Sequence, residues 1–398
     1  MVAALHGERA LIEPSHGWRV VAFLVAATVV KLLASPFAGS TADIHQQLRQ
    51  AEAFVAGLDV LDPANTGGNP SFFPVGHYVI AAAALLAAGA TATPFAIWIK
   101  TPAVVADLAI ALVLRRQARV GDVGATLYML SPVSLLLSVH HGQLHTVATA
   151  LGVGAVALAE RARPVVAALV LGLAVTVRQH FAVLLVPLAR RFGSNAAWPL
   201  LAFAGVVVVV NLPLLQSTRV HRALTPTWTP GVWGYAVILQ QGPRVLELVG
   251  VQVGAALATL NALLATRGSI IYLVWAVVFA VWVWRRPAVD RWRAALLFFT
   301  GFYAVSPGFG VQWFVWALPF WIVVSLRGAT VYSMLAGTFA GLLYWVWTFN
   351  AKYGVTSITA DLGVLNAGDR ALYILTGVVG LVTWGYCVRT AWRLFRCP

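Results

Sequence analysis

The chain has 398 residues, of which 60% are hydrophobic and 10% are charged, and its formal net charge is +14. An ordinary soluble domain has about 25% charged residues, so this composition excludes a water-soluble surface. The positive charge does not indicate a nucleic-acid partner, because the basic residues form short clusters between apolar runs, as in membrane proteins with positive cytoplasmic loops.

Apolar runs of about 18 or more residues recur along the chain, and each is long enough to cross a membrane as a helix. The sequence therefore predicts an all-α, polytopic transmembrane bundle of about 10 to 12 spans, with both termini on the cytoplasmic side. We expect one integral membrane domain over residues 1–398. In it, 18–38 is the first span, 39–71 an external loop, 72–216 the core, and 217–398 a variable set of C-terminal helices.

The segment after the first span has four acidic residues and one arginine, a balance typical of an external loop. Apolar residues recur in it at four- and three-residue steps, which predicts an amphipathic helix along the membrane surface. These residues are Ile44, Leu48, Ala51, Val55 and Leu58. Asp43 stands at the head of this helix. Its carboxylate is either a solvated loop acid or a functional group at the membrane boundary.

Later basic clusters are expected to be cytoplasmic. They are Arg115-Arg116-Arg119, Arg161-Arg163, Arg190-Arg191, Arg285-Arg286-Arg291-Arg293, Arg327 and Arg389-Arg393-Arg396. Two further apolar segments, 72–90 and 244–265, are long enough to be spans, but the alternation of basic clusters leaves no place for a span there. One or both are therefore expected to be re-entrant, tilted or surface-lying. Arg178 interrupts the apolar stretch 164–189, which predicts two short helices that meet at mid-depth.

Ionisable groups at membrane depth are costly and are therefore functional candidates. His141 and His145 are four residues apart, so two imidazoles on one helix face could bind a metal. A zinc protease would have Glu where Gly142 stands, and polar residues that bridge neighbouring helices are the alternative. Arg178 needs an anionic partner, either a phosphate or a carboxylate such as Asp107.

Several short motifs occur in chain order. They are Asp43 after the first span, Phe73-Pro74-Val75, Pro132…His141-Gly142-Gln143, Arg178-Gln179…Pro187, and Ser306-Pro307…Gln312-Trp313…Trp316…Pro319. Together they resemble the GT-C superfamily of multi-span glycosyltransferases, which use dolichyl- or polyprenyl-phosphate sugars, and within it the bacterial mannosyltransferases. The chain departs from the family pattern at Arg178 (for Lys), at Trp313 (for Tyr), and at Leu144-His145, where many members have an acid or amide after Gly-Gln.

The resemblance implies that 39–71 is the catalytic loop and 72–216 the GT-C core. It assigns the catalytic base of an inverting transfer to Asp43. Arg178 and His141 are the candidates for binding the donor phosphate, where charge grows in the transition state. The further substrate-binding candidates are His140, Gln143, Gln179, His180, Gln312 and Trp313. No metal and no cofactor are expected.

The implied reaction moves a hexose, mannose by family analogy, from a polyprenyl-phosphate carrier to a lipid or glycan acceptor at the external face. Membrane lipids are the other expected partners, and the oligomeric state is open. The abundance of Ala, Val and Arg is compatible with a GC-rich bacterial genome and hence with the bacterial plasma membrane.

Two other classes of protein fit parts of the pattern. A transporter or flippase of a lipid-linked or anionic substrate would explain many spans and a buried arginine, but it predicts an inverted repeat, which the sequence does not show. An oligosaccharide ligase or polymerase would place its large external loop late in the chain, whereas the acidic loop here comes first.

Overall fold

The computed structural model describes residues 17–39, 41–67, 73–190, 192, 196–220, 250, 254–286, 288–306, 308, 310–348, 352–353 and 364–396. Throughout these residues every regular element is a helix, so the all-α prediction is confirmed. The elements are α1 (Gly17–Ala34), η2 (Ser35–Ala38), α2 (Ala42–Val55), α3 (Val75–Thr91), α4 (Phe95–Arg115), α5 (Gly121–Leu130), α6 (Pro132–Leu135), η3 (Leu136–His141), α7 (His145–Glu160), α8 (Pro164–Val177), η4 (Gln179–Leu184), α9 (Leu185–Ala189), α10 (Ala197–Asn211), η6 (Leu212–Gln216), α13 (Gly254–Trp284), α14 (Arg291–Val305), η7 (Val311–Trp313), α15 (Phe314–Val324), α16 (Leu326–Trp347) and α18 (Ala367–Arg396).

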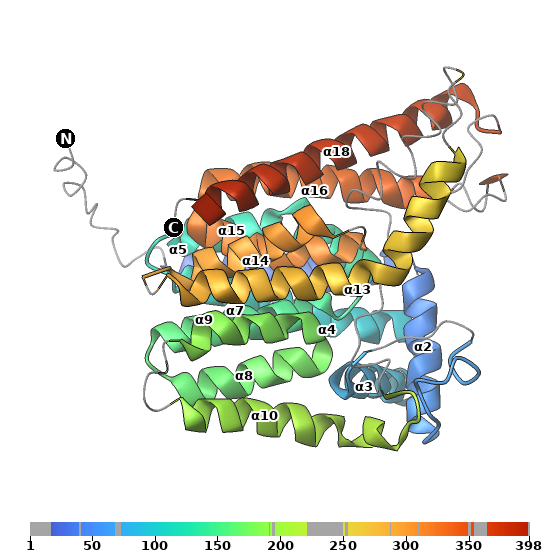
Figure 1. Ribbon diagram of the computed structural model, residues 1–398. Helices are drawn as coiled ribbons and strands as arrows, with labels where there is room; N and C mark the ends of the chain where they lie inside the picture. The colour runs from blue at the N-terminus through green and yellow to red at the C-terminus, as the bar shows by residue number, and fades with distance from the viewer. Residues whose placement is uncertain are drawn as a thin grey trace.

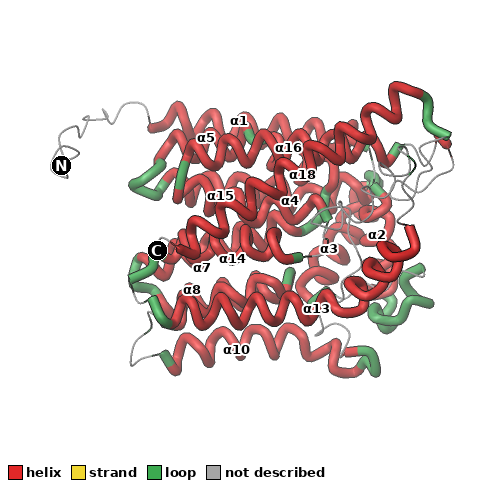
Figure 2. Tube along the Cα trace, turned by 45° about the horizontal axis from the view of Figure 1, so that its top comes forward, coloured by secondary structure: helices red, strands yellow, loops and turns green. Residues whose placement is uncertain are grey.

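Most of these helices run side by side along one direction, as α8 and α10 do in both views (Figures 1 and 2). In the part of the chain that the structure describes, five helical segments are long and apolar enough to cross a membrane, or six if the bent pair of α5 and α6–η3 is counted as one span. The five are α1 with η2, α4, α10 with η6, α16 and α18. Six further apolar helices have between 10 and 17 residues. The chain therefore has the helices, as well as the composition, of a membrane protein.

Loops rich in arginine gather at one end of the bundle, which we call the basic end. Arg115 Nη2 donates to the carbonyl of Gly17 (2.9 Å) at the start of α1. Arg119 forms an ion pair with Asp290 (2.9 Å), just before α14. In the same region Arg286 Nη1 donates to a carbonyl near the end of α18 (2.8 Å), and α18 ends there in Figure 1.

Helices α2 and α3 lie across the opposite end, which we call the α2 end (Figure 1). Because α3 is seen nearly end-on while the bundle helices are seen from the side, segment 72–90 does not run along the bundle as a span would. Helix α4 also starts at the α2 end, since Lys100 Nζ donates to the carbonyls of Ser35 (3.0 Å) and Gly39 (2.7 Å). Segment 72–90 therefore lies crosswise to the bundle helices, which agrees with the expectation that it is not an ordinary span.

The second ambiguous segment, 244–265, lies partly outside the described residues. From Gly254 onward it forms the first part of α13, which continues to Trp284. The break expected at Arg178 is present, because α8 ends at Val177 and η4 begins at Gln179.

The predicted amphipathic helix is α2, and it ends at Val55. Ile44 and Ala51 on the predicted apolar face are buried against the bundle. Val55 and Leu58 are about half exposed (50% and 51%), because they stand at and beyond the end of the helix.

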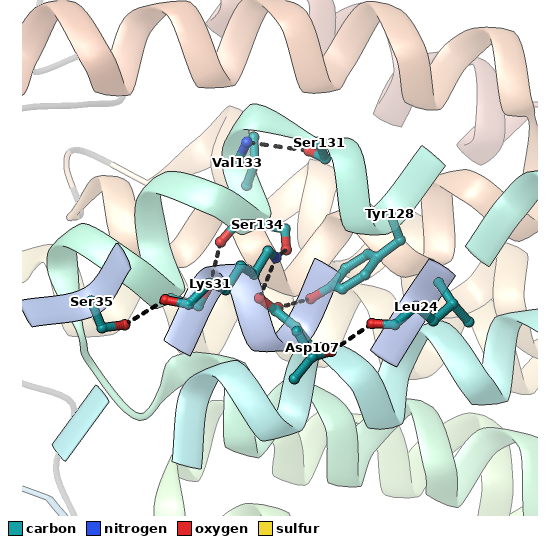
Figure 3. A network of polar contacts seen from close by, with 10 residues as sticks. Leu24, Lys31, Ser35, Asp107, Tyr128, Ser131, Val133 and Ser134 are labelled. Carbon is teal, nitrogen blue, oxygen red and sulfur yellow. Dashed lines mark hydrogen bonds and ion pairs between the residues drawn. The ribbon is translucent and has the colours of Figure 1, made fainter. Parts of the chain in front are cut away.

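A buried polar network holds α1, α4, α5 and α6 together, and Figure 3 shows its side chains turned toward one another. Lys31 Nζ contacts Asp107 Oδ2 (2.7 Å) and Ser134 Oγ (2.6 Å). Tyr128 donates to Asp107 Oδ1 (2.8 Å). Asp107 is therefore the partner of Lys31, and the ion pair considered between Asp107 and Arg178 is not formed. With both carboxylate oxygens bonded, the network meets the condition under which a buried ion pair is tolerated.

Candidate functional site

The proposed catalytic carboxylate lies in the first turn of α2, at the α2 end of the bundle. Its helix is fixed to the bundle because Thr41 Oγ1 donates to the carbonyl of His141 (3.4 Å) and Ile44 is buried. The side chain of Asp43 remains 32% exposed, although Ile44 next to it is 2% exposed. Asp43 is thus placed at a boundary where a carboxylate can meet a ligand.

His141 reaches Asp43 because the backbone changes direction twice. Helix α5 ends just before Pro132, and the helix axis then bends by 48° into α6 and η3. The π-helical turn η3 then ends at Gly142, whose φ of +69° favours glycine. A Cβ at Gly142 would also stand 2.6 Å from a carbon of the Lys100 side chain. This geometry places His141 Nε2 2.8 Å from Asp43 Oδ2.

The Asp43 carboxylate is held in its ionised form. Burial alone raises the pKa of this carboxyl, but hydrogen bonds from His141 and Gln143 and the charges of His141 and Arg178 together outweigh burial. The pKa of Asp43 therefore lies below its ordinary value of 3.8. At neutral pH the group is an anion that accepts protons weakly.

Arg178 occupies the break between α8 and η4, and it is 1% exposed. Its Nη1 contacts His77 Nδ1 (3.0 Å) and donates to the carbonyl of Val177 (2.9 Å). Its Nε lies 3.4 Å from the ring nitrogens of His145, and its guanidinium stacks over Phe73 at 4.1 Å. Buried Nη2 has no hydrogen-bond partner among the described residues. Because a buried unpaired donor is costly, Nη2 is a natural contact for an anionic ligand.

Aromatic rings form a wall beside this guanidinium. His180 faces both Trp313 and Trp316, with ring centroids 5.0 Å apart in each pair. The two indoles stack on each other at 4.7 Å, and His145 lies 5.3 Å from Trp316. The structure therefore brings His180 and Trp313 next to the Arg178 group.

The remaining predicted residues are placed differently. His140 Nδ1 lies 2.6 Å from the carbonyl of Ala38, so this imidazole fixes the chain before α2. Gln179 begins η4 next to Arg178. Gln312 folds back on its own turn, where a Cβ at Gly310 would stand 2.2 Å from Gln312 Oε1.

The alternative of a metal held by His141 and His145 does not match the local geometry. His141 ends η3 and His145 begins α7, so the turn at Gly142 separates the two imidazoles onto different helices. Within the described ranges, no group of three or more His, Cys, Asp and Glu side chains is arranged to hold a metal ion.

The sequence interpretation did not include three side chains that the fold adds to the site. His77 and Gln50 contact each other (Nε2 to Oε1, 3.1 Å) next to Arg178. Tyr344, from α16, packs on His140 (4.6 Å) and His141 (5.7 Å). Its buried hydroxyl has no partner among the residues that the structure describes. His77 follows the Phe73-Pro74-Val75 motif and could have been suspected, whereas nothing in an apolar run distinguishes Tyr344.

No protein-family model matches the chain, and no curated protein or solved structure matches it either. The function is therefore inferred from the site, in which an ionised carboxylate, an imidazole and a buried guanidinium converge at one end of a helical bundle, with one guanidinium nitrogen unpartnered among the described residues.

Proposed function

We propose that the protein is a membrane glycosyltransferase of the GT-C type, which transfers a hexose, mannose by analogy, from a polyprenyl-phosphate carrier to a lipid or glycan acceptor with inversion. The observation that carries the proposal is the pairing of Asp43 with His141 at 2.8 Å, close enough to Arg178 for the guanidinium to lower the pKa of the carboxyl.

In the proposed reaction the acceptor hydroxyl attacks the anomeric carbon from the side opposite the phosphate. The bond between that carbon and the phosphate oxygen breaks, and its electron pair leaves with polyprenyl phosphate. Asp43 takes the hydroxyl proton. Because its lowered pKa makes it a weak base, we infer that the proton moves late, once the attacking oxygen has gained positive charge.

The leaving phosphate gains negative charge in the transition state, so fixed donors that face it lower the barrier. Arg178 Nη2 supplies two N–H groups that have no partner among the described residues. His141 Nδ1, also buried and unpartnered there, supplies a third donor when the imidazole is protonated, because Nε2 already faces Asp43. Arg178 carries a fixed charge opposite to that of the phosphate. The proposal therefore needs no metal ion.

We further propose about 10 to 12 membrane crossings, with the basic end in the cytoplasm of a bacterial cell and the α2 end outside. Two observations support this orientation. The Arg115, Arg119 and Arg286 loops all lie at the basic end, and Asp43 lies at the opposite end. Apolar helices shorter than a full span, such as the 14-residue α8, would cross in pairs with neighbours or reach the site from one side.

The decisive experiment is incubation of the purified protein with a panel of synthetic polyprenyl-phosphate sugars and a glycolipid acceptor extract, with release of free polyprenyl phosphate as the measurement. We expect release from one sugar, lost in Asp43→Asn and kept in the presence of a metal chelator. Absence of release from every hexose donor would reject the glycosyltransferase proposal, and loss on chelation would reject the metal-free mechanism.

A further inference from the structure

We propose that His77, held by Gln50, is a positioning residue that turns the Arg178 guanidinium so that Nη2 faces the donor phosphate. This inference rests on the proposed function, because it assigns to Arg178 the phosphate of a polyprenyl carrier. It adds two residues, from α3 and α2, that no motif in the sequence assigned to the site.

The chemistry of the three side chains, Arg178, His77 and Gln50, decides which atom donates in each hydrogen bond between them. A guanidinium donates and does not accept, so His77 Nδ1 must accept from Arg178 Nη1 at 3.0 Å. The imidazole proton is then on Nε2, which donates to Gln50 Oε1 at 3.1 Å. A protonated imidazole could not accept, and it would place two cations 3.0 Å apart in a buried site, so His77 is neutral here.

The arrangement leaves one nitrogen of the guanidinium available. Nη1 uses its two N–H groups on His77 and on the carbonyl of Val177, and Nε points at His145. The two N–H groups of Nη2 have no partner among the described residues. Because the guanidinium is planar and rigid, fixing Nη1 also fixes the direction of Nη2.

The scaffold around His77 is tightly packed. His77 and Gln50 are both 0% exposed. The ring of Phe73 lies 4.3 Å from that of His77 and 4.1 Å from the Arg178 guanidinium, so it covers both partners. Helix α3 packs directly on the end of α8, since a Cβ at Gly76 would stand 2.7 Å from the carbonyl oxygen of Thr176. These contacts join α2, α3 and α8 at the point where Arg178 leaves its helix.

Two substitutions of His77 separate positioning from folding. In His77→Asn the side-chain oxygen stands as far from the backbone as Nδ1 and still accepts from Arg178, but the link to Gln50 is lost. In His77→Gln the amide nitrogen stands as far out as Nε2 and still donates to Gln50, but Arg178 loses its acceptor. Both variants bury a neutral polar group in place of the imidazole, so their thermal unfolding temperatures in detergent should fall by similar amounts.

The measurements are kcat and KM with the active polyprenyl-phosphate sugar, and the Kd for polyprenyl phosphate alone. We expect His77→Gln to raise KM and Kd by roughly 10- to 100-fold, the effect of losing one charge-assisted hydrogen bond. We expect His77→Asn to stay within about threefold of the wild type, since that bond remains. Gln50→Leu leaves the Nε2 proton of His77 without an acceptor, so nothing favours the tautomer whose Nδ1 accepts from Arg178, and its effect should lie between the two.

The outcomes keep the inference distinct from the proposed function. If the wild type turns over and the Asn and Gln variants are weakened equally, His77 does not position Arg178, although the glycosyltransferase proposal stands. If no sugar is transferred but polyprenyl phosphate binds with the expected split between the variants, the positioning role stands and the enzymatic proposal fails. Should His77→Gln not fold, a Kd for Gln50→Leu equal to that of the wild type would overturn the inference.

Discussion

Replacement of Asp43 by Asn is the sharpest test of the site, because the structure predicts that it changes chemistry far more than folding. Asn has the same shape as Asp, and its side-chain oxygen can accept from His141 Nε2 at the position now 2.8 Å away. Exchanging a charged for a neutral acceptor costs about 1 kcal/mol of unfolding free energy. Since the side chain is one-third exposed (32%), the new amide can also be solvated.

Turnover should respond very differently. An amide cannot take the proton of the acceptor hydroxyl, and a general base contributes roughly 10²- to 10⁴-fold to the rate. We therefore expect kcat of Asp43→Asn to fall at least to this extent. Donor binding should be unchanged or tighter, because the substitution removes an anion next to the site assigned to the donor phosphate.

The assay is release of polyprenyl phosphate under saturating donor, with thermal unfolding of each protein in detergent. Glu52→Gln is a matched control, since it makes the same acid-to-amide change at an exposed position of the same helix. A kcat for Asp43→Asn within about tenfold of the wild type would refute the assignment of the base. An equal loss in Glu52→Gln would show that the charge of α2, rather than Asp43, matters.

The same assay has a pH arm with a defined sign. The folded-state pKa of Asp43 is below 3.8, so its ionised form is present, and its contribution to stability complete, at pH values above 3.8. The ionised form and its contribution to stability are lost only as the pH falls through the lowered pKa of the folded state. Titration of Asp43 should therefore cause no decline in kcat/KM between about pH 7 and pH 5. If the wild-type kcat/KM does decline as pH falls through that window, and Asp43→Glu shifts the pH of the decline, the pKa of Asp43 is not lowered.

Three further substitutions test the contacts around the site. Arg178→Lys should raise the donor KM roughly 10- to 100-fold, because an ammonium cannot hold its protein partners and present two parallel donors to phosphate; an unchanged KM would point to a structural role. Gly142→Ala should lower the unfolding free energy by about 1–3 kcal/mol, because φ of +69° strains an alanine and its Cβ would stand 2.6 Å from the Lys100 side chain. Gly57 has the same φ but nothing within 4 Å of a Cβ, so Gly57→Ala should cost less. Thermal unfolding of the two variants makes the comparison. Lys31→Met should cost about 3–5 kcal/mol by leaving a buried carboxylate unpaired, and a second change, Asp107→Leu, should restore part of the loss; no restoration would mean that the pair is not the cause.

The candidate side chains could be found from the sequence, but their mutual contacts could not. Asp43 and His141 stood out because ionisable groups are rare in this apolar chain, and Arg178 because it interrupts an apolar stretch. Tyr344 carries no such signal, and the only signal at His77 is its place just after the Phe73-Pro74-Val75 motif. They enter the site through packing between α3 and α8 and between α16 and η3, which depends on how distant helices meet.

The partner of a buried charge was equally undecided. From the sequence, Arg178 needed an anion, and Asp107 was one of its possible partners. The arrangement of α1, α4 and α5 gave it to Lys31, with Tyr128 and a serine completing its bonds. That choice left the guanidinium of Arg178 with unpaired donors, and it could not be read from spacing along the chain.

Composition and periodicity by themselves determined that this protein is a bundle of apolar helices, that an amphipathic helix follows the first apolar run, and that the helix breaks at Arg178. These are local properties, set by side-chain hydrophobicity and by backbone preferences within a few residues. The tertiary structure alone decided that α3 lies across the end of the bundle, and that Asp43 meets His141. Such contacts join residues far apart in the chain, so they depend on the packing of whole helices rather than on any local pattern.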